Sequence, residues 1–138
     1  MKLILGFATF LIPVLLSADI AFAGCSLLKS TYKDIGGKGF QLDFSGQTAT
    51  LSRQRQKLFE FNLTQSQGYG TVYLMEKSNP ESSYGVYFFG SDLKQSSSGR
   101  GFDNAPTYAF VSGLGSAVYY RDRSILLGDT LWKFDRCK

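Results

Sequence analysis

Residues 40–64 read FQLDFSGQTATLSRQRQKLFEFNLT, and apolar side chains recur at every second position in much of this stretch. In its first five residues, phenylalanine and leucine alternate with glutamine and aspartate. Period two is typical of a β-strand with one buried face, because successive side chains point to opposite sides of a sheet. Ser45-Gly46-Gln47 and Arg53-Gln54-Arg55-Gln56 interrupt the pattern with residues that favour tight turns. The stretch therefore predicts three strands, over 40–44, 48–53 and 57–64, joined by hairpins.

The same pattern continues toward the end of the chain. Further strands are predicted over 69–76, 84–93, 108–112, 117–121 and 130–136, all rich in Val, Phe, Tyr, Leu or Trp. Seven or eight short strands joined by turns form a meander, and eight can close so that no edge is left unpaired. We therefore expect an all-β fold, a single antiparallel up-and-down β-barrel of about eight strands. A transmembrane barrel is the weaker alternative, because no clean outward apolar band is visible.

The first 23 residues have the layout of a secretory signal peptide. Met1-Lys2 precede an apolar run over residues 3–16, and Ala21-Phe22-Ala23 matches a small-residue cleavage site. At about 14 residues, the apolar run is shorter than the ~20 that a membrane-spanning helix needs. We predict cleavage after Ala23, which leaves a single barrel domain over residues 24–138 in a secreted or periplasmic protein.

Cys25 and Cys137 are the two cysteines of the chain, and they lie close to the two ends of the predicted domain. In an oxidising compartment such a pair favours a disulfide. A closed barrel brings its first and last strands together, as the required Cα separation of roughly 4.4–6.8 Å demands. The alternative is a lipid anchor on Cys25, since Gly24-Cys25 resembles the end of a lipobox. That signal normally has Leu, Val or Ile where Phe22 stands, so the disulfide is the favoured interpretation.

The chain is mildly basic, with 15 Lys and Arg against 11 Asp and Glu, a net charge of +4. Such a charge favours anionic surfaces and allows peripheral contact with a membrane, although it is also common in secreted proteins that bind none. The basic turn over residues 53–57 is more typical of a solvated loop than of a phosphate site. We expect no specific nucleic-acid partner.

Histidine is absent from the sequence. This excludes the Ser-His-Asp triad, the Cys-His dyad, imidazole general bases and nearly every zinc or copper site. We expect no cofactor, no metal and no enzymatic activity. An enzyme that uses only carboxylates and arginine is the remaining catalytic alternative.

One connection, over residues 94–107, is long and rich in Ser and Gly. Loops of this length in compact domains are either functional or disordered. If functional, it would offer Arg100, Phe102 and Asp103 as contact residues.

Eight tyrosines make up a large share of the aromatic residues. Tyr119 and Tyr120 are adjacent, so on a strand they would point to opposite faces and at least one would be exposed. Exposed tyrosines are good contact residues for proteins or glycans. Cross-strand packing on the outer face would explain them equally well.

Residues 32–73 carry a recognisable series of features. They are Tyr32, Gly36-Gly37, the alternating strand over 40–44, Ala49-Thr50-Leu51 and Gly70-Thr71-Val72-Tyr73. The series resembles the periplasmic and membrane-bound inhibitors of C-type lysozymes. Asp34 stands where that family has a cysteine, and Tyr69 stands where it has a loop serine. The resemblance implies an eight-stranded barrel whose loops plug the cleft of a lysozyme, with Ser66, Gly70 and Tyr73 as the inhibitory residues.

Two functional hypotheses follow. The first is a binding protein, an inhibitor or immunity factor, that acts through barrel loops on a lysozyme or another exported enzyme. Its candidate contact residues are Ser66, Tyr69, Gly70, Tyr73, Arg100, Phe102 and Asp103. The second is a lipocalin-like carrier of a small apolar ligand in a barrel mouth lined by Phe88, Phe110 and Trp132. The bulk of Phe59, Phe61, Phe88 and Trp132 is enough to fill a barrel of this size, so the interior decides between them.

Overall fold

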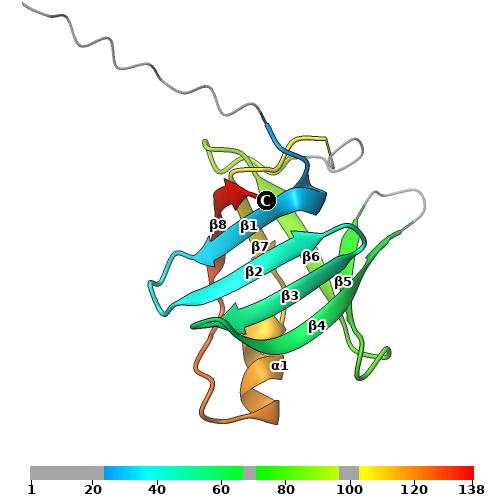
Figure 1. The fold of residues 1–138 in the computed structure, drawn as a ribbon, viewed down its shortest axis with the longest axis vertical. Helices are drawn as coiled ribbons and strands as arrows, with labels where there is room; N and C mark the ends of the chain where they lie inside the picture. Colours follow the sequence, from blue (N-terminus) through cyan, green and yellow to red (C-terminus); the bar gives the residue numbers. More distant parts are fainter. Residues whose placement is uncertain (1–23, 67–70, 97–102) are drawn as a thin grey trace, which may run out of the picture.

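The computed structural model describes residues 24–66, 71–96 and 103–138. These residues form a closed barrel in which eight antiparallel strands follow one another in sequence order, as Figure 1 shows. The strands are β1 (Ser30–Asp34), β2 (Phe40–Ser45), β3 (Thr48–Arg53), β4 (Gln56–Gln65), β5 (Val72–Glu76), β6 (Ser83–Phe89), β7 (Tyr108–Val111) and β8 (Leu131–Cys137). A short 3-10 helix, η1 (Leu27–Lys29), precedes β1, and one α-helix, α1 (Leu114–Arg121), separates β7 from β8. The predicted up-and-down barrel is confirmed.

The alternating stretch forms β2, β3 and β4 as predicted. Phe44 pairs with Ala49 and Leu42 with Leu51, and all four side chains are buried in the interior. Arg53 pairs with Gln56 across a two-residue turn. The two turn residues have positive φ angles of 51° and 67°, the conformation that matches the twist of a hairpin.

The barrel closes where β1 pairs with β8. Tyr32 lies opposite Phe134 and Asp34 opposite Trp132, with a bulge between Thr31 and Tyr32. β1 was not among the predicted strands, because its residues Ser-Thr-Tyr-Lys-Asp show little apolar alternation. Its polar side chains are buried through hydrogen bonds: the Thr31 hydroxyl donates to the Asp43 carboxylate at 2.6 Å.

The prediction of a strand over residues 117–121 is wrong, because this segment belongs to α1. Leu114 and Val118 lie one helical turn apart and both are buried against the core, so helical spacing, and not period two, buries the apolar side chains here. Tyr119 and Tyr120 consequently do not point to opposite faces of a sheet, and both are exposed. The barrel still has eight strands, because β1, which was not predicted, takes the place of the strand predicted over residues 117–121.

Two strand ends also differ from the prediction. β5 begins at Val72, and the start predicted at residue 69 lies outside the described residues. β6 ends at Phe89, because the chain then turns and the Leu93 amide donates to the Gly90 carbonyl at 3.0 Å.

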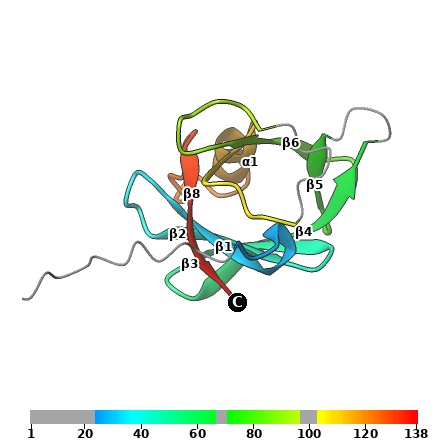
Figure 2. The ribbon, with the colours of Figure 1, turned by 90° about the horizontal axis from the view of Figure 1, so that it is seen from above.

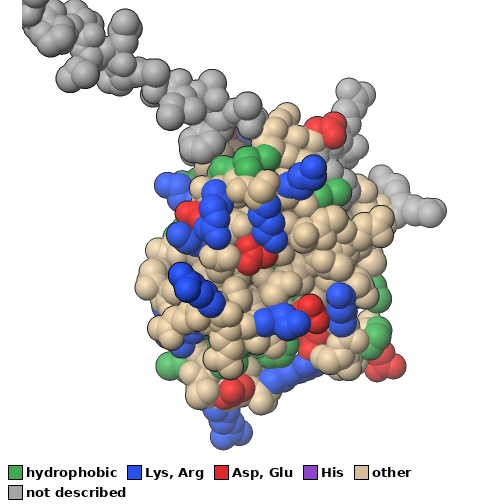
Figure 3. Space-filling model, viewed as in Figure 1, with side chains coloured by type: hydrophobic (Ala, Val, Ile, Leu, Met, Phe, Trp, Pro, Cys, Tyr) green, Lys and Arg blue, Asp and Glu red, His purple; other side chains and the backbone are tan. Residues whose placement is uncertain are grey.

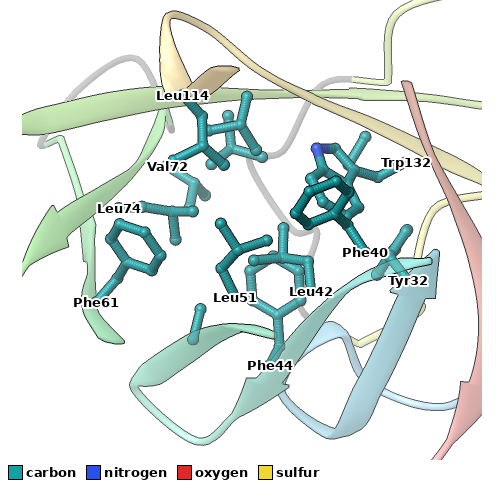
Figure 4. Packing of buried hydrophobic residues seen from close by; sticks show 14 of the residues in the cluster. Tyr32, Phe40, Leu42, Phe44, Leu51, Phe61, Val72, Leu74, Leu114 and Trp132 are labelled. Atoms are coloured by element: carbon teal, nitrogen blue, oxygen red, sulfur yellow. The ribbon is translucent and has the colours of Figure 1, made fainter. Parts of the chain in front are cut away.

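One hydrophobic core fills the barrel (Figure 4). Its largest fully buried side chains include Trp132, Tyr32, Phe40, Phe44 and Phe61. The core is covered by α1 and Leu127 near one end and by Leu27 of η1 near the other. Seen from above, the strands surround this shared interior (Figure 2). Every buried hydrophobic residue of the core lies between Leu27 and Trp132, so residues 24–138 contain the whole described core.

Candidate binding surface

The order of the strands gathers several connections at one end of the barrel. The β2–β3, β4–β5 and β6–β7 connections lie there, together with the start of β1 and the end of β8. We call this the disulfide end. Of the candidate contact residues that the structure describes, Ser66 belongs to the β4–β5 connection, Asp103 belongs to the β6–β7 connection, and Tyr73 is the second residue of β5. The topology therefore places the two predicted loops at the same end.

A disulfide joins Cys25 to Cys137, with their Cα atoms 5.8 Å apart, which confirms the predicted bond. Backbone hydrogen bonds surround it: the Ala105 amide donates to the Cys25 carbonyl at 2.7 Å, and the Lys138 amide donates to the Lys29 carbonyl at 2.8 Å. The N-terminal segment, the end of the β6–β7 connection and β8 are thus fastened to one another.

Tyr32 anchors the same connection from inside the barrel. Its hydroxyl donates to the Pro106 carbonyl at 2.7 Å, and its ring makes edge contacts with Phe44 and Phe134. Burial raises the pKa of the Tyr32 phenol well above its usual value, so the group stays a neutral donor. The tyrosine singled out by the resemblance is therefore a core residue.

The structure describes three of the seven candidate contact residues. Ser66 is half-buried; its amide donates to the Thr71 carbonyl at 2.9 Å, while its hydroxyl is buried without a hydrogen-bond partner in the described structure. Tyr73 lies on the outer face of β5, and Asp103 is exposed. The remaining four lie outside the described residues: Tyr69, Gly70, Arg100 and Phe102.

A hollow of about 580 Å³ lies beside the disulfide, bordered by Cys25, Ala105, Thr107 and Phe134 among others. Asp135 and Lys133 stand at its edge. The Asp135 carboxylate pairs with Lys33 at 3.2 Å and also contacts Arg136. Partial burial by itself would raise the pKa of Asp135, but hydrogen bonds from these two cations hold it below its usual value.

A second surface lies on the outside of β5, β6 and β7, and we call it the aromatic face. Side chains on these strands alternate between the core and the outside. The large outward side chains are Tyr73, Met75, Tyr87, Phe89, Tyr108 and Phe110. None of them belongs to the core cluster or to the partly buried residues packed against it. Tyr87 is the most exposed, at 41%.

Strand register sets these side chains next to one another. Tyr87 is opposite Phe110, and Phe89 is opposite Tyr108. Tyr73 is opposite Gly85, and the Tyr87 ring lies within 3.5 Å of the place that a Cβ at Gly85 would occupy. The outward residues of β5, β6 and β7 include no charged side chain.

The position of Phe110 corrects one expectation of the carrier hypothesis. Phe110 does not line the interior, because it alternates with the buried residues Ala109 and Val111 and so points outward. Phe88 and Trp132 do point inward, at 3% and 1% exposed. With Phe61 they fill the interior, as their bulk predicts.

Charge is divided unevenly around the barrel. Residues 24–60 and 132–138, which form η1, β1 to β3, the start of β4 and most of β8, hold nine Lys and Arg against four Asp and Glu. Residues 61–131 hold five against six. Figure 3 shows Lys and Arg spread over the face formed by β1 to β4. The aromatic face therefore belongs to the part of the barrel that carries none of the excess positive charge.

Sequence reasoning missed the aromatic face as a unit. Tyr73 was the one member predicted as a contact residue, and the other members were not singled out as contact residues. The available signal was the pair of runs Tyr87-Phe88-Phe89 and Tyr108-Ala109-Phe110, in which both phases of the alternation are apolar. A strand with two apolar faces either lies between layers or presents one face for contact.

Comparison with known proteins gives no match to a family model, to a curated protein or to a solved structure. Among the described residues, no helix is long and apolar enough to cross a bilayer. The same residues include no group of three or more His, Cys, Asp or Glu able to hold a metal ion.

Proposed function

We propose that this protein is a non-enzymatic binding protein, secreted or periplasmic, that holds another protein against its aromatic face. The observation that carries the proposal is the composition of that face: five aromatic side chains and one methionine with no charge among them. The centres of protein interfaces are enriched in Tyr, Phe and Met and depleted in charged residues, which is the same composition.

The backbone that carries the rings is also fixed before any partner binds. The rings project from three paired strands of a closed barrel, so little backbone conformational entropy remains to be lost on association. Aromatic side chains of this kind supply a large share of the binding energy in protein interfaces.

The disulfide end extends this surface. The β4–β5 and β6–β7 connections both join the disulfide ends of β5, β6 and β7, the strands that carry the aromatic face. The candidate residues in those connections would then contact the rim of the same partner. The resemblance to lysozyme inhibitors suggests a lysozyme or another exported enzyme as that partner, with the protein acting as an inhibitor or immunity factor.

A carrier function is less well supported. The side chains at the barrel interior are fully buried and bulky, and lipocalin-like carriers need an internal cavity of several hundred Å³. The hollow beside the disulfide is bordered by half-buried and exposed residues such as Cys25, Asn104 and Lys133, and the hollow at the β1–β2 turn reaches the core only at Phe40.

Capture from a periplasmic extract, combined with a lysozyme inhibition assay, tests the proposal. Residues 24–138 would be immobilised as wild type and as the variants Tyr87→Ser and Phe110→Ser. Loss of a central interface aromatic is expected to weaken the complex by roughly 30-fold or more. Tyr120→Ser is the matched control, because Tyr120 is 82% exposed but lies on α1, away from the aromatic face.

Two results would contradict the proposal. One is the absence of any captured protein together with no inhibition of lysozyme. The other is a captured protein whose binding falls equally with Tyr120→Ser. Capture without lysozyme inhibition would retain the binding function and replace the suggested partner.

A further inference from the structure

The end of the barrel opposite the disulfide end has a different surface. The β1–β2, β3–β4, β5–β6 and β7–β8 connections lie there, and the β5–β6 connection contributes one cation and one anion, Lys77 and Glu81. We call the part formed by residues 35–39, 53–57 and 119–127 the helix end. Four of the six large hydrophobic residues that are exposed in the described structure lie here: Ile35, Tyr119, Tyr120 and Leu126. Leu126 is 62% exposed and Ile35 is 55% exposed.

Hydrogen bonds hold these separate segments together. The Lys38 ammonium donates to the carbonyl oxygens of Leu126 at 3.2 Å and Leu127 at 3.1 Å. The Ile35 amide donates to the Leu131 carbonyl at 3.0 Å, and the Arg53 guanidinium donates to the Lys38 carbonyl at 3.2 Å. The exposed apolar side chains therefore project from a fixed base.

The same three segments are strongly basic. They contain Lys38, Arg53, Arg55, Lys57, Arg121 and Arg123 against one acidic residue, Asp122. Lys38, Arg53, Lys57 and Arg121 have partners within the protein. Arg55 and Arg123 are exposed, and no partner for either is found in the described part of the chain.

Local turns present those two arginines outward. Arg55 occupies the two-residue turn between β3 and β4 with a φ angle of 67°. Arg123 lies in a turn closed by the Asp122 carboxylate, which accepts hydrogen bonds from the Ser124 amide at 2.9 Å and the Ser124 hydroxyl at 2.6 Å. A hollow of about 410 Å³ between these turns is lined by Arg53, Gln54 and Ser124 among others, so the two turns are neighbours.

We propose that the helix end docks onto the surface of a bilayer that contains anionic phospholipid. Isolated aliphatic and tyrosine side chains would enter the interfacial layer, and the arginines would contact the phosphate groups. A protein interface would be depleted in charge at its centre, as the aromatic face is, whereas this surface mixes apolar side chains with cations. The proposal does not rest on the proposed function and leaves the aromatic face uncovered.

Sedimentation with vesicles tests this assignment. Residues 24–138 would be mixed with vesicles of phosphatidylcholine and phosphatidylglycerol at 3:1, and with phosphatidylcholine alone. We expect binding to the anionic vesicles that weakens as salt is raised. Arg55→Gln with Arg123→Gln is expected to lower the partition coefficient roughly 30-fold, because each cation near such a surface contributes about 1 kcal/mol. The separate pair Ile35→Ser with Leu126→Ser is also expected to lower the partition coefficient on the same vesicles, because these side chains would no longer enter the interfacial layer.

The matched control is Leu93→Ser with Lys94→Gln. This pair also combines an exposed apolar residue with a cation, but it lies in the β6–β7 connection at the disulfide end. Circular dichroism and Trp132 fluorescence would verify that each variant is folded. Three outcomes overturn the proposal: no binding to anionic vesicles, an equal loss in the control pair, or helix-end-dependent binding to soluble dextran sulfate without vesicle binding.

Discussion

Arg121, the last residue of α1, forms an ion pair with Glu76 of β5, whose side chain is only 2% exposed. The Glu76 carboxylate also accepts a hydrogen bond from the Ser78 hydroxyl at 2.5 Å. The Arg121 guanidinium lies over the Phe59 ring, 5.7 Å from its centre. A buried carboxylate is costly unless it is paired, so this contact fixes the helix against the wall of the barrel.

Removal of the cation should therefore destabilise the fold strongly. Arg121→Met leaves Glu76 buried without its charge partner, and we expect a loss of about 3 kcal/mol in the free energy of unfolding. Urea denaturation followed by the fluorescence of Trp132, which is the single tryptophan, measures it. The double variant with Glu76→Met should recover much of the loss. Arg123→Met, at an exposed site, should change stability by less than about 0.5 kcal/mol.

A side chain at Gly115 should be poorly tolerated. A Cβ atom there would collide with the backbone of Gly128, so α1 and the segment before β8 could not keep their present approach. We expect Gly115→Ala to lower stability by about 1–3 kcal/mol, the range for overpacking, despite the better helix propensity of alanine. Ser116→Ala on the exposed side of the same helix serves as the control. Equal unfolding midpoints for the two variants would contradict the close packing.

Loss of the disulfide should have the largest effect on stability. The bond joins residues 112 positions apart, and the chain-entropy model assigns about 4–5 kcal/mol to a loop of that length. Cys25→Ser with Cys137→Ser is expected to shift the urea midpoint accordingly, and reduction of the wild type should produce the same shift. Mass spectrometry of the protein isolated from its native cells provides a separate check, because a diacylglycerol on Cys25 would exclude the bond.

Asp135 gives a stability contribution that depends on pH. Its pKa is lowered in the folded protein, so its stabilising effect is present above the usual aspartate value of about 4 and is lost as pH falls through the folded value. We expect Asp135→Asn to be less stable than the wild type at pH 7, with the difference shrinking below about pH 4. Urea titrations between pH 7 and pH 3 measure it. A difference that stays constant over this range would show that the Lys33 and Arg136 contacts do not act through charge.

Much of the barrel could be predicted from the sequence, because period-two alternation reports directly on strands with one buried face. β2, β3 and β4 follow that pattern. The disulfide was predictable because closure of the barrel brings the first and last strands, and with them Cys25 and Cys137, together. β1 could not be found in this way, since burial of Thr31 depends on Asp43, a partner in the next strand. Val118, Tyr119 and Tyr120 of α1 have high β-propensity, and packing over one helical turn overrides it.

The candidate surface was less accessible to sequence reasoning for a related reason. In β6 and β7 both phases of the alternation are apolar, so the pattern does not say which phase faces outward. The register decides it: Ala109 and Val111 face the core, and Phe110 is left outside opposite Tyr87. The sequence named Ser66 and Asp103 as contact residues without placing them relative to each other. A meander sends alternate connections to the same side, and both residues lie at the disulfide end.

The bond between Cys25 and Cys137 makes the polypeptide between them a covalent circle, and the pairing of β1 with β8 makes the hydrogen-bonded sheet a circle as well. A protease that cuts one exposed connection between the two cysteines would therefore release no fragment. The disulfide still joins the two pieces, and their strands remain hydrogen-bonded to neighbouring strands. Two separate cuts, or one cut together with a reductant, would be needed before any piece could leave.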